Sequence, residues 1–156
     1  MKLSGRDLSY FDPTDNTKYV PYVIEPAFGL SRLTLAVMCE AYDRVATDDG
    51  ERTIMRFKPS IAPVTAAVLP VVKKLSAEAM EVYRLLAREF NVEYDEAGAI
   101  GKRYYRFDEI GTPWCVTIDS EHYDRGEVTV RHRDSGEQET VKIAELIEWI
   151  RSGLTA

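Results

Sequence analysis

Histidine and cysteine are scarce in this chain of 156 residues, which has two of each. Cys39 and Cys115 each stand alone inside an apolar run, and His122 and His132 are equally isolated. None of these residues has the spacing of a metal-ligand motif. We therefore expect no metal site, and we expect both cysteines to be buried, reduced thiols, as in a cytoplasmic protein.

Long hydrophobic runs are also missing. No apolar stretch approaches the roughly 20 residues that cross a bilayer, and no signal-peptide pattern opens the chain. Internal repeats and low-complexity tracts are absent as well. Hydrophobic residues make up 45% of the chain and charged residues 29%, as in ordinary globular proteins. These features predict a cytoplasmic protein without a membrane partner, built from one domain with or without an appendage.

An excess of positive charge is the third absence, since the formal net charge is −6. Proteins that bind duplex nucleic acid without sequence preference tend to be basic, because neutralising phosphates dominates their affinity. We therefore expect no DNA partner. An acidic protein can still bind RNA when its cations gather on one face and unstacked bases supply stacking and hydrogen bonds.

The most informative stretch of the sequence is Gly98–Asp119. Its first half has the composition of a helix and carries three cations, Lys102, Arg103 and Arg106. Gly111 is expected to end this helix, and Trp114–Ile118 is aromatic and β-branched, as buried strands are. A basic helix that leads into a strand places cations at a sheet edge, where α/β folds bind ligands. The alternative is a solvated helix that leads into a core strand.

The N-terminal part is expected to form a β-hairpin followed by a helix. The two strands are expected at Leu8–Phe11 and Tyr19–Ile24, and the helix at Leu30–Val45. Gly29 and Arg32 flank the start of this helix. Helix amides and a guanidinium can bind one phosphate there. Alternatively, Arg32 makes a salt bridge within the fold.

The remaining sequence predicts an α/β domain. Asp43–Glu51 is polar, acidic and glycine-bearing, like a linker, and we place the linker at residues 47–58, between domains at 1–46 and 59–156. Strands are expected at Ala66–Val71, Val92–Asp95, Trp114–Ile118, Val128–Arg133 and Glu139–Lys142. Helices are expected from Ser76, which acts as a cap, from Gly98 to Gly111, and at Ile143–Arg151, with Gly153 as its stop. They make a mixed five-stranded sheet with flanking helices.

The run Ile100–Thr117 reads Ile-Gly-Lys-Arg-Tyr-x-Arg-x-Asp-Glu-Ile-Gly-Thr-Pro-x-Cys-Val-Thr. This pattern resembles the C-terminal part of glycyl-tRNA synthetases of the α2, class II type. The similarity extends to Ile61–Pro63, Ala67–Pro70, Lys73–Ser76 and Phe90–Asp95. It implies the anticodon-binding domain of class IIa synthetases, with the anticodon loop of a glycine tRNA as its partner.

The resemblance also implies which residues bind tRNA. Lys102, Arg103, Arg106, Arg131 and Arg133 would bind phosphates or bases, and Asp108, Glu109 and Thr112 would bond to base edges. Each has an alternative interpretation as a solvated charged or polar group. The chain departs from the family pattern at Thr65, Tyr105, Phe107 and His132. These changes remove polar groups and add aromatic surface, so they either favour base stacking or alter tRNA selectivity.

The N-terminal part resembles motif 3 of the class II catalytic core. The motif spans Val23–Arg32, and the resemblance implies that Arg32 contacts the γ-phosphate of ATP, that Glu25 holds the glycine amino group, and that Gly29 belongs to the same site. Ala27 stands where the family usually has serine. Residues 1–46 would then be a remnant of the catalytic core. Motifs 1 and 2 have no room before residue 23, so we expect no aminoacylation by this chain alone, and ATP and Mg²⁺ only in a complete synthetase.

Three functions are compatible with the sequence. The first is the tRNA-binding part of a glycyl-tRNA synthetase, which recognises the anticodon while a complete catalytic domain carries out aminoacylation. The second is a non-catalytic accessory subunit, in which residues 1–46 bind a catalytic synthetase chain or a second copy of the chain. The third is the small subunit of a split synthetase.

Overall fold

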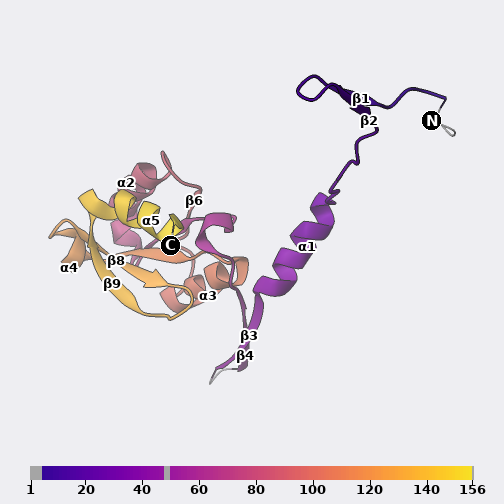
Figure 1. The fold of residues 1–156 in the computed structure, drawn as a ribbon. Coiled ribbons are helices and arrows are strands. Elements are labelled where there is room, and N and C mark those ends of the chain that lie inside the picture. Colours follow the sequence, from indigo (N-terminus) through magenta and orange to yellow (C-terminus); the bar gives the residue numbers. More distant parts are fainter. Residues whose placement is uncertain (1–4, 48–49, 156) are drawn as a thin grey trace. The chain divides into compact units, whose positions relative to one another are not determined.

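The computed structural model describes residues 5–47 and 50–155 (Figure 1). The chain divides into two compact units, Met1–Leu33 and Thr34–Ala156. Helix α1 (Leu30–Ala41) contains the boundary between them. The domain limits expected from the sequence, at residues 46 and 58, stay predictions.

The first unit contains the expected β-hairpin, with strands β1 (Tyr10–Asp12) and β2 (Thr17–Tyr19). Tyr10 pairs with Tyr19, and their rings meet edge to face with centroids 5.9 Å apart. The expected second strand at Tyr19–Ile24 is wrong, because β2 ends at Tyr19 and residues 20–29 form neither helix nor strand. Pro21 has no N–H to donate, which disfavours a continuing ladder.

The expected linker forms a second β-hairpin. Helix α1 ends at Ala41, four residues before the expected end, and leads directly into strand β3 (Tyr42–Thr47). Strand β3 pairs antiparallel with β4 (Gly50–Met55). The stretch Asp43–Glu51, expected to be an irregular linker, therefore contains paired strand residues at 43–47 and 50–51, and the division of the chain by a linker at 47–58 stays a prediction. The polar composition gave no signal for strands, although Ile54 of β4 is buried, at 1% exposure.

The main sheet is mixed and five-stranded, as predicted (Figure 1). Its order is β6-β5-β7-β8-β9. The strands are β5 (Ala66–Pro70), β6 (Val92–Tyr94), β7 (Trp114–Ile118), β8 (Glu127–His132) and β9 (Gln138–Lys142). Strands β6, β5 and β7 run parallel, and β8 and β9 are antiparallel to their neighbours.

Helices cover both faces of this sheet. They are α2 (Ser76–Leu86), α3 (Ile100–Ile110), α4 (Ser120–Tyr123) and α5 (Leu146–Thr155), with short 3-10 turns at Pro59–Ile61, Lys73–Leu75 and Ile143–Glu145. Side chains alternate along β5, so Val68 packs with α2 and α5 while Leu69 packs with Phe107 of α3. The result is a three-layer fold whose two cores lie on opposite faces of the sheet.

Two predicted helix ends differ from the structure, and one is confirmed. Ser76 is not a cap, because its hydroxyl lies 2.6 Å from both the carbonyl oxygen of Lys73 and the carboxylate of Glu96. Gly153 lies inside α5, where a Cβ would approach the Trp114 indole to 2.5 Å. Gly111 ends α3 in the left-handed conformation, with φ of 83°, as predicted.

The two cysteines differ in exposure. Cys115 on β7 is buried, as expected, and burial raises the pKa of its thiol to about 12. Cys39 on α1 is exposed, so the prediction that it is buried is wrong. The apolar run around Cys39 places several exposed hydrophobic side chains on α1, including Leu35 and Met38.

Candidate nucleic-acid interface

Helix α3 has one buried side and one exposed side. Phe107 is 4% exposed and packs on the sheet, which anchors the helix. The opposite side presents a set of side chains that we call the α3 face: Lys102, Tyr105, Arg106 and Glu109. The helix follows β6, so its first turn begins near the carboxyl end of a parallel strand, the usual place for α/β binding sites.

Arg106 combines exposure with a structural role. Its side chain is 49% exposed, and its guanidinium forms an ion pair of 2.7 Å with Asp95 and a hydrogen bond of 2.5 Å to the carbonyl of Ala97. Both partners lie in the loop that leads into α3. Arg106 therefore holds this loop against the helix while part of its guanidinium faces solvent.

Arg103 is buried rather than available to RNA. It is 2% exposed, and its Nη1 donates to the carbonyl of Pro70 at 2.7 Å and to that of Asp95 at 3.1 Å. These carbonyls belong to the end of β5 and to the loop after β6. Arg103 therefore connects the carboxyl ends of β5 and β6, and direct contact with RNA would require breaking both hydrogen bonds.

Asp108 is completely buried and forms a charge cluster with two arginines. Arg131 donates to its two carboxylate oxygens at 3.0 and 3.2 Å, and Arg52 of β4 lies 3.5 Å away. Arg131 also lies over the Tyr104 ring, 4.8 Å from its centroid. Burial alone would lower the pKa of Arg131, but the hydrogen bonds and charge of Asp108 raise it above the ordinary value. Direct base contacts by Asp108 and Arg131 would require breaking this cluster.

Arg133 and Thr112 are likewise buried. The guanidinium of Arg133 donates to the carbonyls of Gly111 and Phe57, each at 2.8 Å, and it pairs with Asp134. Thr112 is 0% exposed, and its hydroxyl has no hydrogen-bond partner among the described residues. Of the eight expected tRNA contacts, the structure therefore exposes three, Lys102, Arg106 and Glu109. It gives the other five a role in the interior.

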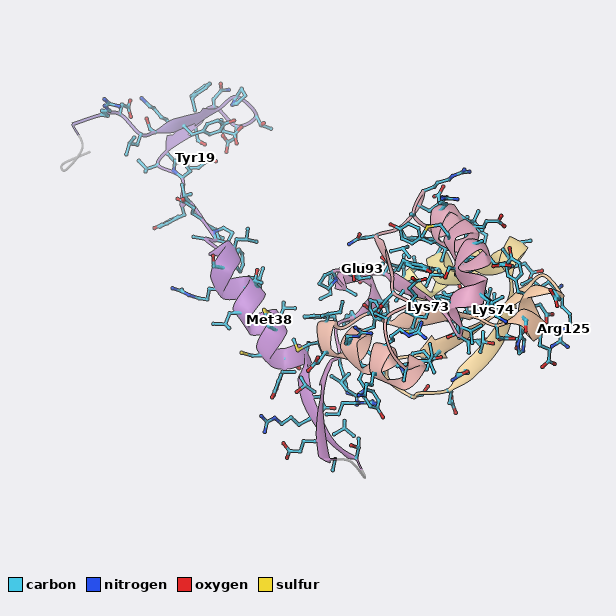
Figure 2. The ribbon with its side chains drawn as sticks, turned by 180° about the vertical axis from the view of Figure 1, so that it is seen from behind. Tyr19, Met38, Lys73, Lys74, Glu93 and Arg125 are labelled. Atoms are coloured by element: carbon cyan, nitrogen blue, oxygen red, sulfur yellow. The ribbon has the colours of Figure 1, made fainter. Side chains whose placement is uncertain are left out.

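Sequence reasoning missed several cationic residues outside the α3 face. Arg52 lies over the Tyr105 ring, 4.8 Å from its centroid, and this pair joins β4 to the exposed side of α3. Lys73 and Lys74 are exposed in the turn that follows β5 (Figure 2). The signal for the two lysines was their place directly after a buried strand. Nothing in the local pattern around Arg52 pointed to Tyr105.

Tyr105, Phe107 and His132, the aromatic residues at which the chain departs from the family pattern, lie in different environments. Tyr105 is 45% exposed, so its ring is accessible for stacking. Phe107 belongs to the core and presents no surface to RNA. His132 is half-buried, and its Nε2 lies 2.7 Å from the carboxylate of Glu139.

The residues of the motif 3 resemblance lie on an exposed segment. Glu25, Gly29 and Arg32 are all exposed. The amide of Leu33 donates to the carbonyl of Gly29 at 3.0 Å, which marks the first turn of α1. No hydrogen bond or ion pair between Glu25 and Arg32 occurs in the described chain, so the structure does not bring these two together.

Residues 5–47 and 50–155 contain neither a membrane-spanning helix nor a cluster of metal ligands. None of the helices there is both long enough and apolar enough to cross a membrane. That same part of the chain contains no group of three or more His, Cys, Asp or Glu side chains that could hold a metal ion.

The family follows from a comparison with known domains. The family model described as the anticodon-binding domain matches residues 65–153, which include the whole five-stranded sheet and α3. The chain belongs to this family. The resemblance found in the sequence is thereby confirmed at the level of the domain.

Curated relatives extend the match beyond this domain. The glycine–tRNA ligase of Clostridium beijerinckii is 51% identical over 152 residues, or 97% of this chain and 33% of the relative. The glycine–tRNA ligase of Ruminiclostridium cellulolyticum is 52% identical over 153 residues, with the same two shares. The chain thus spans about a third of the length of these relatives and resembles the C-terminal part of glycyl-tRNA synthetases.

Solved structures confirm the fold. The RNA-binding domain of threonyl-tRNA synthetase from Cryptosporidium parvum Iowa II matches with a TM-score of 0.55 and 29% identity, over 58% of this chain and 23% of that one. Histidyl-tRNA synthetase from Nostoc sp. PCC 7120 matches with a TM-score of 0.56 and 26% identity, over 59% and 23%. The mixed sheet with flanking helices is therefore that of the anticodon-binding domains of class II synthetases.

Proposed function

We propose that this domain binds the anticodon region of a glycine tRNA through the α3 face. The observation that carries the proposal is the separation of its cations. Arg103, Arg131 and Arg133 are engaged in the interior, whereas Lys102 and Arg106 stay exposed on one helix. An acidic protein needs such a local concentration of positive charge to attract phosphates.

The α3 face offers the groups that unpaired RNA requires. Lys102 supplies a cation for a phosphate, and Glu109 supplies an acceptor for a base amino group. Arg52 covers one side of the Tyr105 ring. A base that stacks on the exposed part of this ring would extend the stack, which contributes about 1–3 kcal/mol per base in single-strand binding proteins.

In this proposal, aminoacylation is carried out together with a complete catalytic domain in the cytoplasm. ATP and Mg²⁺ act there, and Glu25, Gly29 and Arg32 contribute to the ATP and glycine site as the motif 3 resemblance implies. Aminoacylation requires two substrates to be held in line, and the proposal assigns that step to the complete catalytic domain.

A gel-shift titration tests the proposal. We expect the chain to bind a glycine tRNA transcript more tightly than the same transcript with a substituted anticodon, and Lys102→Ala to weaken binding to the first. Lys142→Ala is the matched control, because Lys142 is an exposed lysine on β9 that pairs with Glu145. Equal affinity for both transcripts, or equal loss in the two lysine variants, would contradict the proposal.

A second candidate function is a protein-interaction subunit. Residues 20–30 expose large apolar side chains, with Tyr22 at 102%, Ile24 at 93% and Phe28 at 81%. Apolar surface of this extent favours a protein partner, either a catalytic synthetase chain or a second copy. Analytical ultracentrifugation distinguishes the second copy from a monomer. Charging activity restored by adding a chain with motifs 1 and 2 would identify the small subunit of a split synthetase.

A further inference from the structure

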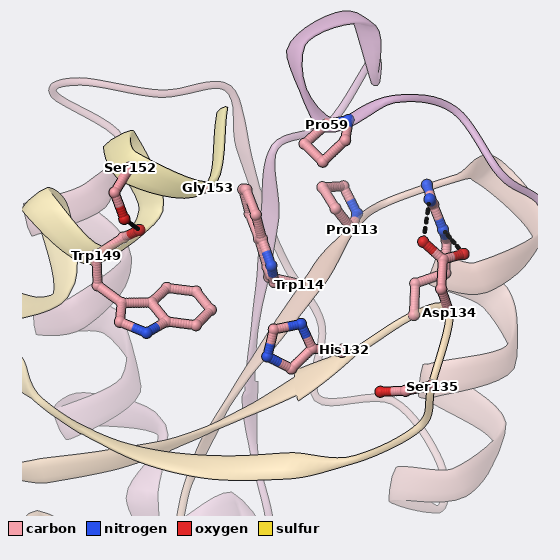
Figure 3. Close-up of a pocket in the computed structure, with 10 residues that line it drawn as sticks. Pro59, Pro113, Trp114, His132, Asp134, Ser135, Trp149, Ser152 and Gly153 are labelled. Carbon is pink, nitrogen blue, oxygen red and sulfur yellow. Dashed lines mark hydrogen bonds and ion pairs between the residues drawn. The ribbon is translucent and has the colours of Figure 1, made fainter. Parts of the chain in front are cut away.

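A pocket of about 480 Å³ opens at the end of the sheet where β7 begins (Figure 3). The pocket is lined by the 3-10 turn at Pro59–Ile61, by the start of β7, by the β8–β9 turn and by α5. Its walls include Pro59, Trp114, His132 and Trp149. The pocket shares no residue with the α3 face. That face lies on α3, the helix that precedes β7 in the chain. A volume in this range is typical of small-molecule sites.

The aromatic walls of this pocket are fixed by packing. The Trp149 ring meets both the Trp114 ring and the His132 ring edge to face, with centroids 5.6 Å apart in each pair. Trp114 is 5% exposed and lies against Gly153, where no side chain intervenes. Because these contacts hold the rings without a ligand, the pocket is preformed.

Among the residues of the described chain that line the pocket, Asp134 is the one carboxylate. Arg133 and Arg56 both donate to Oδ1 of Asp134, each at 2.9 Å. Among the described residues, Oδ2 accepts only from Arg133, at 2.7 Å. Burial would raise the pKa of Asp134, but the hydrogen bonds and charges of the two arginines hold it below the ordinary value. The carboxylate is therefore ionised and keeps acceptor capacity for one further donor on Oδ2.

We propose that this pocket binds a nucleobase that carries an exocyclic amino group, stacked among Trp149, His132 and the proline walls, with its amino group donating to Asp134. Aromatic walls suit a flat ring system, and the ionised carboxylate accepts from an amino group such as those of adenine and cytosine. A phosphate is disfavoured, because Arg133 is neutralised by Asp134. The base can come from a free nucleotide or from an unpaired position of an RNA.

Tryptophan fluorescence provides a direct readout, because the chain has two tryptophans and both line the pocket. The full chain is titrated with AMP, with IMP and with ribose 5-phosphate, and N-acetyltryptophanamide corrects for absorption by the nucleotides. We expect saturable quenching by AMP. The dissociation constant of IMP, which lacks the amino group, should be larger than that of AMP by about tenfold or more. Ribose 5-phosphate should have no effect. An adenosine hexanucleotide that quenches where AMP does not would identify a base within RNA as the source.

Two variants keep the proposal falsifiable. Asp134→Asn should remove the preference for AMP over IMP, and Trp149→Leu should weaken binding of both. Lys142→Ala should leave quenching by AMP unchanged, because this exposed lysine on β9 lies outside both the pocket and the α3 face. Equal effects of AMP, IMP and ribose 5-phosphate would overturn the proposal, as would quenching by none of the probes or an unchanged preference for AMP in Asp134→Asn.

Discussion

Arg131 makes a bidentate interaction with Asp108 beneath the exposed side of α3. Its Nη1 donates to Oδ1 at 3.0 Å and its Nη2 donates to Oδ2 at 3.2 Å. The two residues come from β8 and α3, so the pair joins the sheet to the helix that carries the proposed RNA interface. Both side chains are buried, at 8% and 0% exposure. Arg131 and Asp108 would therefore contribute to RNA binding by fixing the position of α3.

The first prediction concerns removal of one member of this pair. Asp108→Ala should lower the free energy of unfolding by about 3–5 kcal/mol, because it leaves the buried charge of Arg131 without its partner. Urea unfolding measures this loss. The double variant Asp108→Leu with Arg131→Met should be more stable than Asp108→Ala, since the buried guanidinium of Arg131 is removed and the remaining arginine, Arg52, is 20% exposed. If the double variant is the less stable of the two, the buried charge is not the cause.

The second prediction separates backbone strain from packing at two glycines. Gly98 and Gly111 both have φ of +83°, but a Cβ at Gly98 would meet open space, whereas one at Gly111 would meet the Phe57 ring and the Met55 carbonyl. Gly98→Ala should cost about 1–2 kcal/mol from the left-handed conformation alone. Gly111→Ala should cost about 1–3 kcal/mol more, because it overpacks the junction with Phe57. Thermal unfolding of both variants checks the difference, and equal costs would contradict it.

The third prediction concerns the salt dependence of RNA binding. If Lys102 neutralises one phosphate of an unpaired loop, Lys102→Ala should reduce the slope of log affinity against log salt by about 0.7. Gel shifts at several salt concentrations measure the slope. Lys142→Ala should leave it unchanged, and a slope unchanged in Lys102→Ala would remove this lysine from the interface.

The fourth prediction concerns alkaline pH. Burial raises the pKa of Cys115 from 9.0 to about 12. The unfolded state therefore loses this proton first, and the contribution of Cys115 to stability is lost as pH rises from about 9 to about 12. Cys115→Val should show a shallower decline in unfolding free energy over this range than the parent chain. Tyrosines titrate in both proteins, so the difference between the two curves isolates the thiol.

Much of the sheet could be predicted because its strands carry their signal locally. Ala66–Pro70 is a continuous apolar run and Trp114–Ile118 is aromatic and β-branched, and both form central strands buried on both faces. Helix α3 could be predicted equally well, because Gly111 marks its C-terminal end. The β3–β4 hairpin was not, because its strands are polar and are held by pairing with each other and by contacts distant in sequence.

The site residues show where sequence reasoning fails. Arg131 and Arg133 are two residues apart, and both contact α3 or the glycine that ends it. Which side is covered depends on the position of α3, and no period-two pattern contains that information. A charged residue can therefore look solvated in the sequence and be buried when its partner, such as Asp108, lies on another element.

The contrast between the two thiols has a practical consequence. Cys39 faces solvent on α1, whereas Cys115 is shielded inside the sheet. A maleimide dye should therefore attach at one position of the unaltered chain. Energy transfer from that dye to a fluorophore on a glycine tRNA would report docking without any engineered attachment point.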